Sequence, residues 1–290
     1  DPKYAWLIQT TGYRPDLNAL IHGVPEGDFP APILGTRPFG NTGRSILGST
    51  LYPATGYAIL RGDERNPEST CVFLNYGPHG GGHGHPDRLS MVLYAHGKQW
   101  VPDFGSFSYD DRRLKSQWTA QTVSHNTVVA DEISHLPQGD GSSMWTTDNI
   151  AQPSLGKLHT FSVDALLKVA RAFSDSAIPG VKLDREVALF DGFVVDCYRV
   201  ESKEKRQYDW VIHVDGQPDS ISVPLRARSG SLGERCGYQH IQDVAEAGVG
   251  RAWTASWKDE EGRGLQVTVL DEAGTRAIRA RSMKNKEDEH

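Results

Sequence analysis

The sequence predicts an all-β protein whose main domain is a large antiparallel β-sandwich. Three observations carry this prediction. From about Ser49 onwards, strand-length runs rich in Val, Ile, Phe and Tyr recur, turn signals separate them, and no amphipathic helices intervene. Many short strands without helices between them favour two packed sheets. With 290 residues, the chain is long enough to bury a substantial core.

The amino-acid composition changes along the chain and divides it into three parts. Residues 1–50 are rich in Pro and Gly, with a short possible helix around residues 2–9, and are interpreted as a linker or the tail of a preceding helical domain. Residues 51–282 form the predicted sandwich. Residues 283–290 are a charged tail that is expected to fray.

The expected strands follow one another at short intervals. They lie at 56–62, 70–76, 89–95, 98–101, 126–131, 166–173, 186–200, 209–216 and 265–273. The longest run contains Asp191-Gly192 between two apolar halves, a pair that is typical of a tight hairpin turn.

Composition excludes several classes of function. A net charge of -6 argues against nucleic-acid binding, which normally requires a basic face. The sequence contains no run of about 18 apolar residues that could span a membrane, so membrane insertion is not expected. No signal peptide is visible at the N-terminus, which lacks an initiator Met, as expected of a processed or excised fragment. Three scattered cysteines without a C-x-x-C pair are expected to be small buried residues.

The stretch from Gly77 to Asp87 concentrates five glycines and three histidines before a strand. Glycine is used where the backbone bends sharply or is approached closely. In an extended segment His83 and His85 point to one face, while Asp103 and His125 lie at expected strand ends. Two histidines and an aspartate make a plausible zinc set with an open fourth position. The alternative is a glycine-rich hairpin whose histidines form hydrogen bonds with the backbone.

Two further side chains near this stretch are candidates for substrate contacts. Arg88 has a planar fork that can bind a carboxylate bidentately, although taken alone it is more readily interpreted as a plain surface arginine. His79 either faces the same cleft or stabilises the loop. His213 alternates with apolar residues and is interpreted as a hydrogen-bonded sheet histidine.

The motifs together resemble a known family. The combination GPHGGGHGHPDRLSMVLYAHGKQWVPDFGSFSY, followed by SHNTVVADE, is similar to the heparinase II/III-like domain of polysaccharide lyases, and within that group to the oligoalginate lyase branch. The flanking runs at 46–62 and 183–200 agree with it.

The resemblance implies a large β-sandwich behind an N-terminal α/α-toroid, and a zinc ion held by His85, Asp103 and His125. It implies that His83 faces the substrate cleft as a catalytic residue. The toroid, which in such lyases supplies a tyrosine and an asparagine or histidine, is not recognisable here, and residues 1–50 resemble only its end. A toroid domain or chain is therefore an expected partner, and the family suggests a periplasmic or secreted location.

The expected function is cleavage of a uronate-containing acidic polysaccharide by β-elimination. His83 would neutralise the carboxylate or assist proton transfer, with Arg88 and His79 as substrate contacts and zinc either holding the loop or activating a water. Alginate is preferred because sulfated substrates call for more clustered Arg and Lys. The alternatives are a heparin or heparan sulfate lyase, a zinc-dependent glycan hydrolase and a noncatalytic carbohydrate-binding module.

Overall fold

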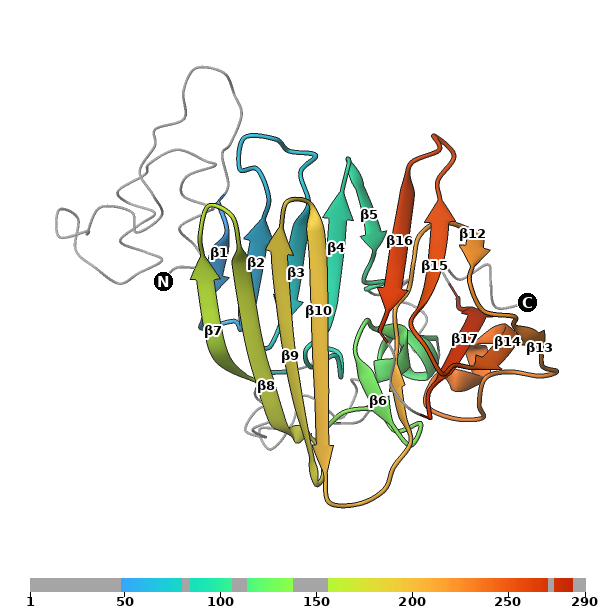
Figure 1. Ribbon diagram of the computed structural model, residues 1–290. Coiled ribbons are helices and arrows are strands. Elements are labelled where there is room, and N and C mark those ends of the chain that lie inside the picture. Colours follow the sequence, from blue (N-terminus) through green and yellow to red (C-terminus); the bar gives the residue numbers. More distant parts are fainter. Residues whose placement is uncertain (1–47, 80–83, 106–113, 138–155, 271–273, 284–290) are drawn as a thin grey trace, which may run out of the picture.

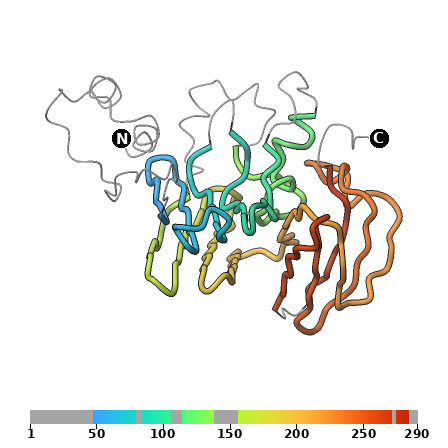
Figure 2. The backbone as a smooth tube through the Cα atoms, turned by 90° about the horizontal axis from the view of Figure 1, so that it is seen from above, coloured from blue at the N-terminus to red at the C-terminus, as the bar shows by residue number. Residues whose placement is uncertain are grey.

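Two antiparallel sheets packed face to face form the body of the protein, as predicted (Figures 1 and 2). The computed structural model describes residues 48–79, 84–105, 114–137, 156–270 and 274–283. Within these residues no helix has the length and apolar character needed to cross a membrane.

The first sheet has five strands in sequence order. They are β1 (Thr50–Tyr52), β2 (Tyr57–Arg61), β3 (Cys71–Asn75), β4 (Met91–Ala95) and β5 (Lys98–Val101). In β2 and β3 buried and half-buried residues alternate, so each strand has an inner and an outer face. The outer face carries Tyr57, Phe73 and Asn75 and leads towards the candidate site.

The second sheet has four long strands in the order β10-β9-β8-β7. They are β7 (Lys157–Val163), β8 (Lys168–Ile178), β9 (Val181–Phe190) and β10 (Phe193–Ser202). Asp191 and Gly192 form the turn of the β9–β10 hairpin, with φ values of 45° and 78°. Two positive φ values are those of the tight turn that the Asp-Gly pair predicted.

The main core lies between these two sheets. Leu60 and Leu74 of the first sheet belong to one buried cluster with Ala172, Leu183 and Val187 of the second, and each is at most 1% exposed. Burying a Leu or Val side chain contributes roughly 1.5–3 kcal/mol relative to exposure. The alternating pattern of the strands therefore gives the sandwich most of its stabilisation.

Smaller elements pack beside the sandwich, drawn in green and in orange to red in Figure 1. They are β6 (Val128–Ala130) with β11 (Tyr208–Trp210); β12 (Gln217–Ile221), β15 (Trp253–Lys258) and β16 (Gly264–Val269); and β13 (Arg226–Ala227), β14 (Gln242–Gly248) and β17 (Arg276–Arg281). The short helical turns are η2 (Lys115–Thr119), η3 (Thr122–Ser124) and η5 (Tyr238–His240). A second buried cluster around Trp118 and Tyr238 joins η2 to the C-terminal strands.

The strand predicted over 209–216 is wrong beyond residue 210, where β11 ends. The next main-chain donors bond to scattered partners: Val211 N–H donates to Thr127 O at 3.0 Å, and Asp215 N–H donates to Trp100 O at 2.9 Å. His213 N–H donates to Asn126 Oδ1 at 2.7 Å. Because no single neighbouring strand accepts these bonds, no ladder forms.

The three cysteines are less buried than the sequence predicted. Cys71, Cys197 and Cys236 are free thiols, but they are only partly buried, so the expectation of burial is wrong in degree. Two of them lie on strands whose outer faces are half-covered. The possible helix at 2–9 and the tail from 284 lie outside the described residues.

Arg185 of β9 ties the second sheet to the segment that carries the site. Its side chain is fully buried, and Nε and Nη2 donate to the two carboxylate oxygens of Asp196, each at 2.8 Å. Nη1 donates to Leu89 O and to Asn126 O, both at 2.6 Å. The guanidinium also lies 5.1 Å from the centroid of the Tyr198 ring. This side chain therefore connects the second sheet with Leu89, which precedes β4, and with the residue that follows His125.

Candidate metal centre and adjoining pocket

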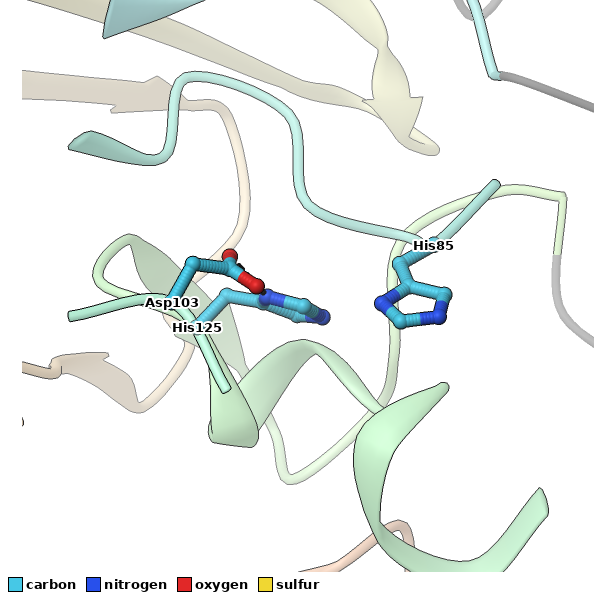
Figure 3. Close-up of side chains that lie close together, drawn as sticks. All are labelled: His85, Asp103 and His125. Carbon is cyan, nitrogen blue, oxygen red and sulfur yellow. Dashed lines mark hydrogen bonds and ion pairs between the residues drawn. The ribbon is translucent and has the colours of Figure 1, made fainter. Parts of the chain in front are cut away.

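Three side chains from three separate segments meet at one end of the first sheet (Figure 3). His85 lies at the end of the glycine-rich stretch, Asp103 lies two residues after β5, and His125 directly follows η3. One ligand atom from each lies within 4.8 Å of the others. The structure thus brings together the three residues that the sequence named as zinc ligands.

His125 and Asp103 form an ion pair in which His125 is buried and Asp103 is partly exposed. His125 is 1% exposed, its Nδ1 lies 2.8 Å from Asp103 Oδ2, and its Nε2 lies 3.1 Å from Thr119 O. Burial pushes the pKa of His125 down, but the charge and hydrogen bond of Asp103 outweigh burial and raise it. For Asp103, burial pushes the pKa up, yet His125 and the Gly105 N–H hold the pKa well below its usual range.

His85 faces this pair without bonding to it. Its ring centroid lies 5.2 Å from that of His125, and its buried Nε2 has no hydrogen-bond partner among the described residues. Burial, followed by the charge of His125, lowers the pKa of His85 to about 4. The imidazole is therefore neutral at pH 7 and keeps a lone pair available for a ligand.

The residues present fit a zinc ion. Zinc bonds of about 2.0–2.2 Å to nitrogen and oxygen place neighbouring ligand atoms about 3.3–3.6 Å apart in a tetrahedron. The three ligand atoms lie within 4.8 Å of one another, so small side-chain movements would bring them to the distances that zinc requires. Thr119 O accepts from Nε2–H of His125, so Nδ1, which faces Asp103, is the nitrogen that would bind the ion after losing its proton. The unpartnered Nε2 of His85 completes a donor set that suits zinc.

Buried hydroxyls and a guanidinium fasten the segment that carries His85. Arg88 donates to Gly77 O at 2.5 Å and to His85 O at 3.2 Å. Thr122 donates to Pro86 O at 2.6 Å, and Thr127 donates to Arg88 O at 2.7 Å. The main chain on both sides of His85 is therefore held by side chains rather than by a sheet.

Arg88 does not occupy the exposed position expected of a substrate contact. It is 1% exposed, and its described bonds go to main-chain carbonyls. A direct contact between Arg88 and a sugar carboxylate is therefore unsupported, and its position is that of a residue that supports the loop.

The other two predicted site residues differ in what the structure describes. His83 lies outside the described residues, so its role stays a prediction. His79 is half-buried; burial, followed by the nearby charge of Arg88, lowers its pKa to about 4, and its Nε2 has no partner among the described atoms. His79 lies outside the group of three.

Asn126 links the strand ends that position the ligands. Its Nδ2 donates to Met91 O at 3.0 Å and to Pro102 O at 2.8 Å. Its Oδ1 accepts from His213 N–H at 2.7 Å. Because Asn126 follows His125 and Pro102 precedes Asp103, one side chain sets the relative positions of two candidate ligands.

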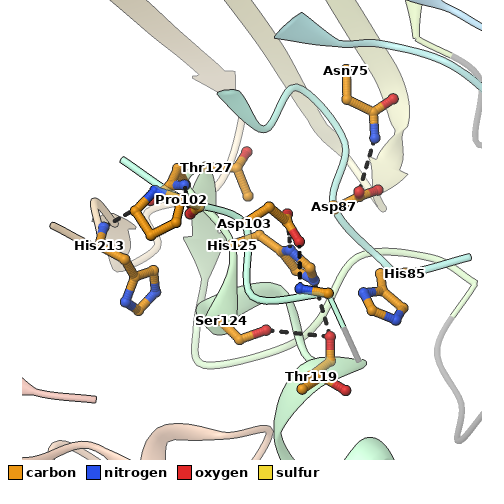
Figure 4. Close-up of polar contacts among 12 residues, drawn as sticks. Asn75, His85, Asp87, Pro102, Asp103, Thr119, Ser124, His125, Thr127 and His213 are labelled. Carbon is orange, nitrogen blue, oxygen red and sulfur yellow. Dashed lines mark hydrogen bonds and ion pairs between the residues drawn. The ribbon is translucent and has the colours of Figure 1, made fainter. Parts of the chain in front are cut away.

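A pocket of about 200 Å³ adjoins the metal centre, with Asp103 in its wall. Its other lining residues come mainly from the outer face of the first sheet and are Tyr57, Phe73, Asn75, Asp87, Ser90 and Val92. Asn75 Nδ2 donates to Asp87 Oδ2 at 2.8 Å, as Figure 4 shows. The sequence analysis missed this set, although Asp87 lies two residues after His85 in HGHPD and was a visible signal.

A family model described as "Heparinase II/III-like, C-terminal" matches residues 47–285. The chain belongs to this family. The expected resemblance is therefore confirmed, and the sandwich described above is that of a heparinase II/III-like C-terminal domain.

Named relatives of this heparinase II/III-like chain are lyases. It is 29% identical over 180 residues to an alginate lyase of Stenotrophomonas maltophilia, covering 56% of this chain and 23% of the relative. It is also 29% identical over 191 residues to an exo-oligoalginate lyase of Saccharophagus degradans, covering 60% and 25%. A heparin-sulfate lyase of Pedobacter heparinus is 29% identical over 108 residues, covering 36% and 16%. The chain spans about a quarter of the length of the two alginate lyases.

A solved structure agrees on the fold. Heparan sulfate lyase of Pedobacter heparinus superposes with a TM-score of 0.52 at 13% identity, covering 96% of this chain and 40% of that one. A mutant of that enzyme gives a TM-score of 0.53 at 14% identity, with the same coverage. At this identity the likeness establishes the fold of the heparinase II/III-like chain and that the neighbour is a longer chain.

Proposed function

We propose that this chain is the β-sandwich portion of a polysaccharide lyase that cleaves a uronate-containing acidic polysaccharide by β-elimination, with alginate or oligoalginate as the substrate. The observation that carries the proposal is the meeting of His85, Asp103 and His125 beside the glycine-rich stretch in a member of this family. The named alginate lyases among its relatives support the choice of substrate.

The chemistry explains which side chains such a site requires. β-Elimination removes the C5 proton beside the uronate carboxylate and expels the 4-linked sugar, leaving a double bond between C4 and C5. The C5 proton is weakly acidic until the carboxylate charge is neutralised, so donors must face that group, with a base near C5 and an acid near the leaving oxygen. We assign the neutralisation of the carboxylate to His83, two residues before His85.

We further propose that His85, Asp103 and His125 hold a zinc ion in a supporting role. When bound, zinc would supply a fixed positive centre that orders its three ligands. His85 then anchors the segment that carries His83, while Thr119 O orients the His125 ring and Asn126 fixes the main chain beside it. A toroid domain or chain is the proposed partner that contributes the remaining acid or base.

A heparin or heparan sulfate lyase is the second candidate. The heparin-sulfate lyase among the relatives favours it, over a shorter matched length than the alginate lyases. The net charge of -6 weighs against a heavily sulfated substrate, because such a polyanion needs clustered cations.

The activity test follows the double bond. Purified chain, with and without a preceding toroid domain, is mixed with alginate oligosaccharides or heparan sulfate, and the ultraviolet absorbance of the unsaturated uronate is recorded. We expect absorbance to grow with alginate and to be abolished in His83→Ala, while His159→Ala, a change at an exposed histidine, leaves it unchanged. Growth with heparan sulfate alone supports the second candidate. Cleavage without absorbance indicates a hydrolase, and binding without cleavage a carbohydrate-binding module.

The metal test is independent of activity. Protein dialysed against zinc and then against metal-free buffer is expected to retain about one zinc per chain by elemental analysis, and His85→Ala or Asp103→Asn to retain little. Zinc at 100 times its Kd should stabilise the native protein by about 2.7 kcal/mol, and a chelator should remove that gain. Equal zinc content in wild type and His85→Ala would contradict the assignment, with His159→Ala as the matched control.

A further inference from the structure

The pocket beside the metal centre contains a buried hydroxyl that makes no hydrogen bond to any residue that the structure describes. Ser90 is 3% exposed and lines the pocket, and its Oγ has no hydrogen-bond partner among the described residues. Buried polar groups are nearly always paired, so an unpaired one that borders a cavity indicates a partner that enters the cavity. This observation is independent of the three candidate metal ligands.

The rest of the pocket wall is rich in acceptors. Asp87 is 18% exposed, and the bond from Asn75 uses its Oδ2. Its Oδ1 lies 3.5 Å from Arg88, a long contact that leaves acceptor capacity free. Asp103 also borders the pocket, but its Oδ1 accepts from Gly105 N–H and its Oδ2 pairs with His125, so the free acceptor capacity belongs to Asp87. The pocket therefore favours a ligand that donates hydrogen bonds and disfavours one that brings a negative charge.

Three further residues of the wall are aromatic or apolar. The rings of Tyr57 and Phe73 lie with centroids 4.8 Å apart, and Val92 lines the pocket beside them. Burial, followed by the charge of Asp87, raises the pKa of Tyr57, so its phenol stays protonated and can donate. A wall that contains both carboxylate or hydroxyl groups and aromatic rings suits a ring with hydroxyls on its edge and C–H bonds on its face.

We propose that this pocket is a subsite for the uncharged, hydroxyl-bearing edge of one pyranose ring, with the carboxylate of that ring directed away from Asp87. Ring hydroxyls donate to Asp87, and Ser90 donates to a ring oxygen. The cavity of about 200 Å³ is below the range of about 300–1,000 Å³ typical of larger ligands, which suits one ring. The inference rests on the proposed function for its ligand class, and it makes Asp87 a determinant of specificity.

The test uses a sugar that cannot undergo elimination. A carboxyl-reduced alginate tetrasaccharide keeps its hydroxyls but has no uronate carboxylate, so its binding reports on the pocket and not on lyase chemistry. Its Kd is measured by NMR titration of the full chain, the same chain with Asp87→Asn, and the same chain with Ser90→Ala. The matched control is Asp191→Asn, the same change of charge in the β9–β10 turn, where Asn is equally suited.

We expect Asp87→Asn to weaken binding about tenfold, because a bond to a charged acceptor is lost, and Ser90→Ala about threefold. Asp191→Asn should be unchanged. Ser90→Ala removes a hydroxyl without a described partner and should fold normally, which keeps the test valid if Asp87→Asn is unstable. The inference is overturned if the reduced sugar does not bind, or if it binds with equal Kd to all four proteins. Absorbance with unreduced alginate then reports separately on the proposed lyase activity.

Discussion

Replacing Arg185 with leucine is expected to destabilise the native protein by about 3–5 kcal/mol, a large share of a typical free energy of unfolding. The change leaves Asp196 without its two bonds and removes the donor to Leu89 O and Asn126 O, all at a position with no exposure. Urea unfolding followed by fluorescence measures the loss.

Two controls separate the buried pair from a general effect of losing an arginine. Arg199→Leu, on the exposed side of β10, should change the free energy of unfolding by no more than about 0.5 kcal/mol. The double replacement Arg185→Leu with Asp196→Leu should recover part of the loss, because no unpaired charge remains. A loss below about 1 kcal/mol in Arg185→Leu would show that the pair contributes little beyond its hydrophobic equivalent.

Replacing Asn126 with alanine should lower the free energy of unfolding by about 3 kcal/mol, since each buried group left unpaired costs about 1–3 kcal/mol. The groups are Met91 O, Pro102 O and His213 N–H. Zinc affinity should fall about 10–100-fold as well, as for other residues that orient metal ligands.

Two measurements separate these two effects of Asn126→Ala. Urea unfolding is measured in the presence of a chelator, and zinc affinity is measured at urea concentrations too low to unfold the protein. The exposed Asn66, whose side chain accepts from the local Glu68 N–H, provides the control Asn66→Ala. An Asn126→Ala protein of reduced stability with unchanged zinc affinity would mean that His125 and Asp103 need no help in keeping their positions.

The strands with a clear in-and-out pattern could be predicted from the sequence. β2, β3 and β4 alternate apolar and half-buried positions, and Asp191-Gly192 marks its hairpin by residue type alone. β12 and β17 were not predicted, because their sequences QPDSI and RAIRAR are largely exposed and carry little apolar signal. Their pairing depends on neighbours that are distant in the sequence.

The candidate site was predicted unevenly for a similar reason. His85, Asp103 and His125 were named from spacing, strand ends and family likeness, and the structure brings them together. The burial of Arg88 could not be predicted, because it depends on carbonyls that only the folded loop places around the guanidinium. Ser90 gave no signal either, since a lone serine before a strand is ordinary until a cavity is seen beside it.

The hydrogen bonds of Arg185 make the site depend on strands that lie far from it in the sequence. Its partners Leu89 and Asn126 lie 96 and 59 residues earlier in the chain. During synthesis from the N-terminus, every candidate metal ligand would leave the ribosome well before this arginine. A graft of residues 75–126 onto another scaffold would carry all three ligands but not this support, so evolution or design must transfer the site together with β9 and β10.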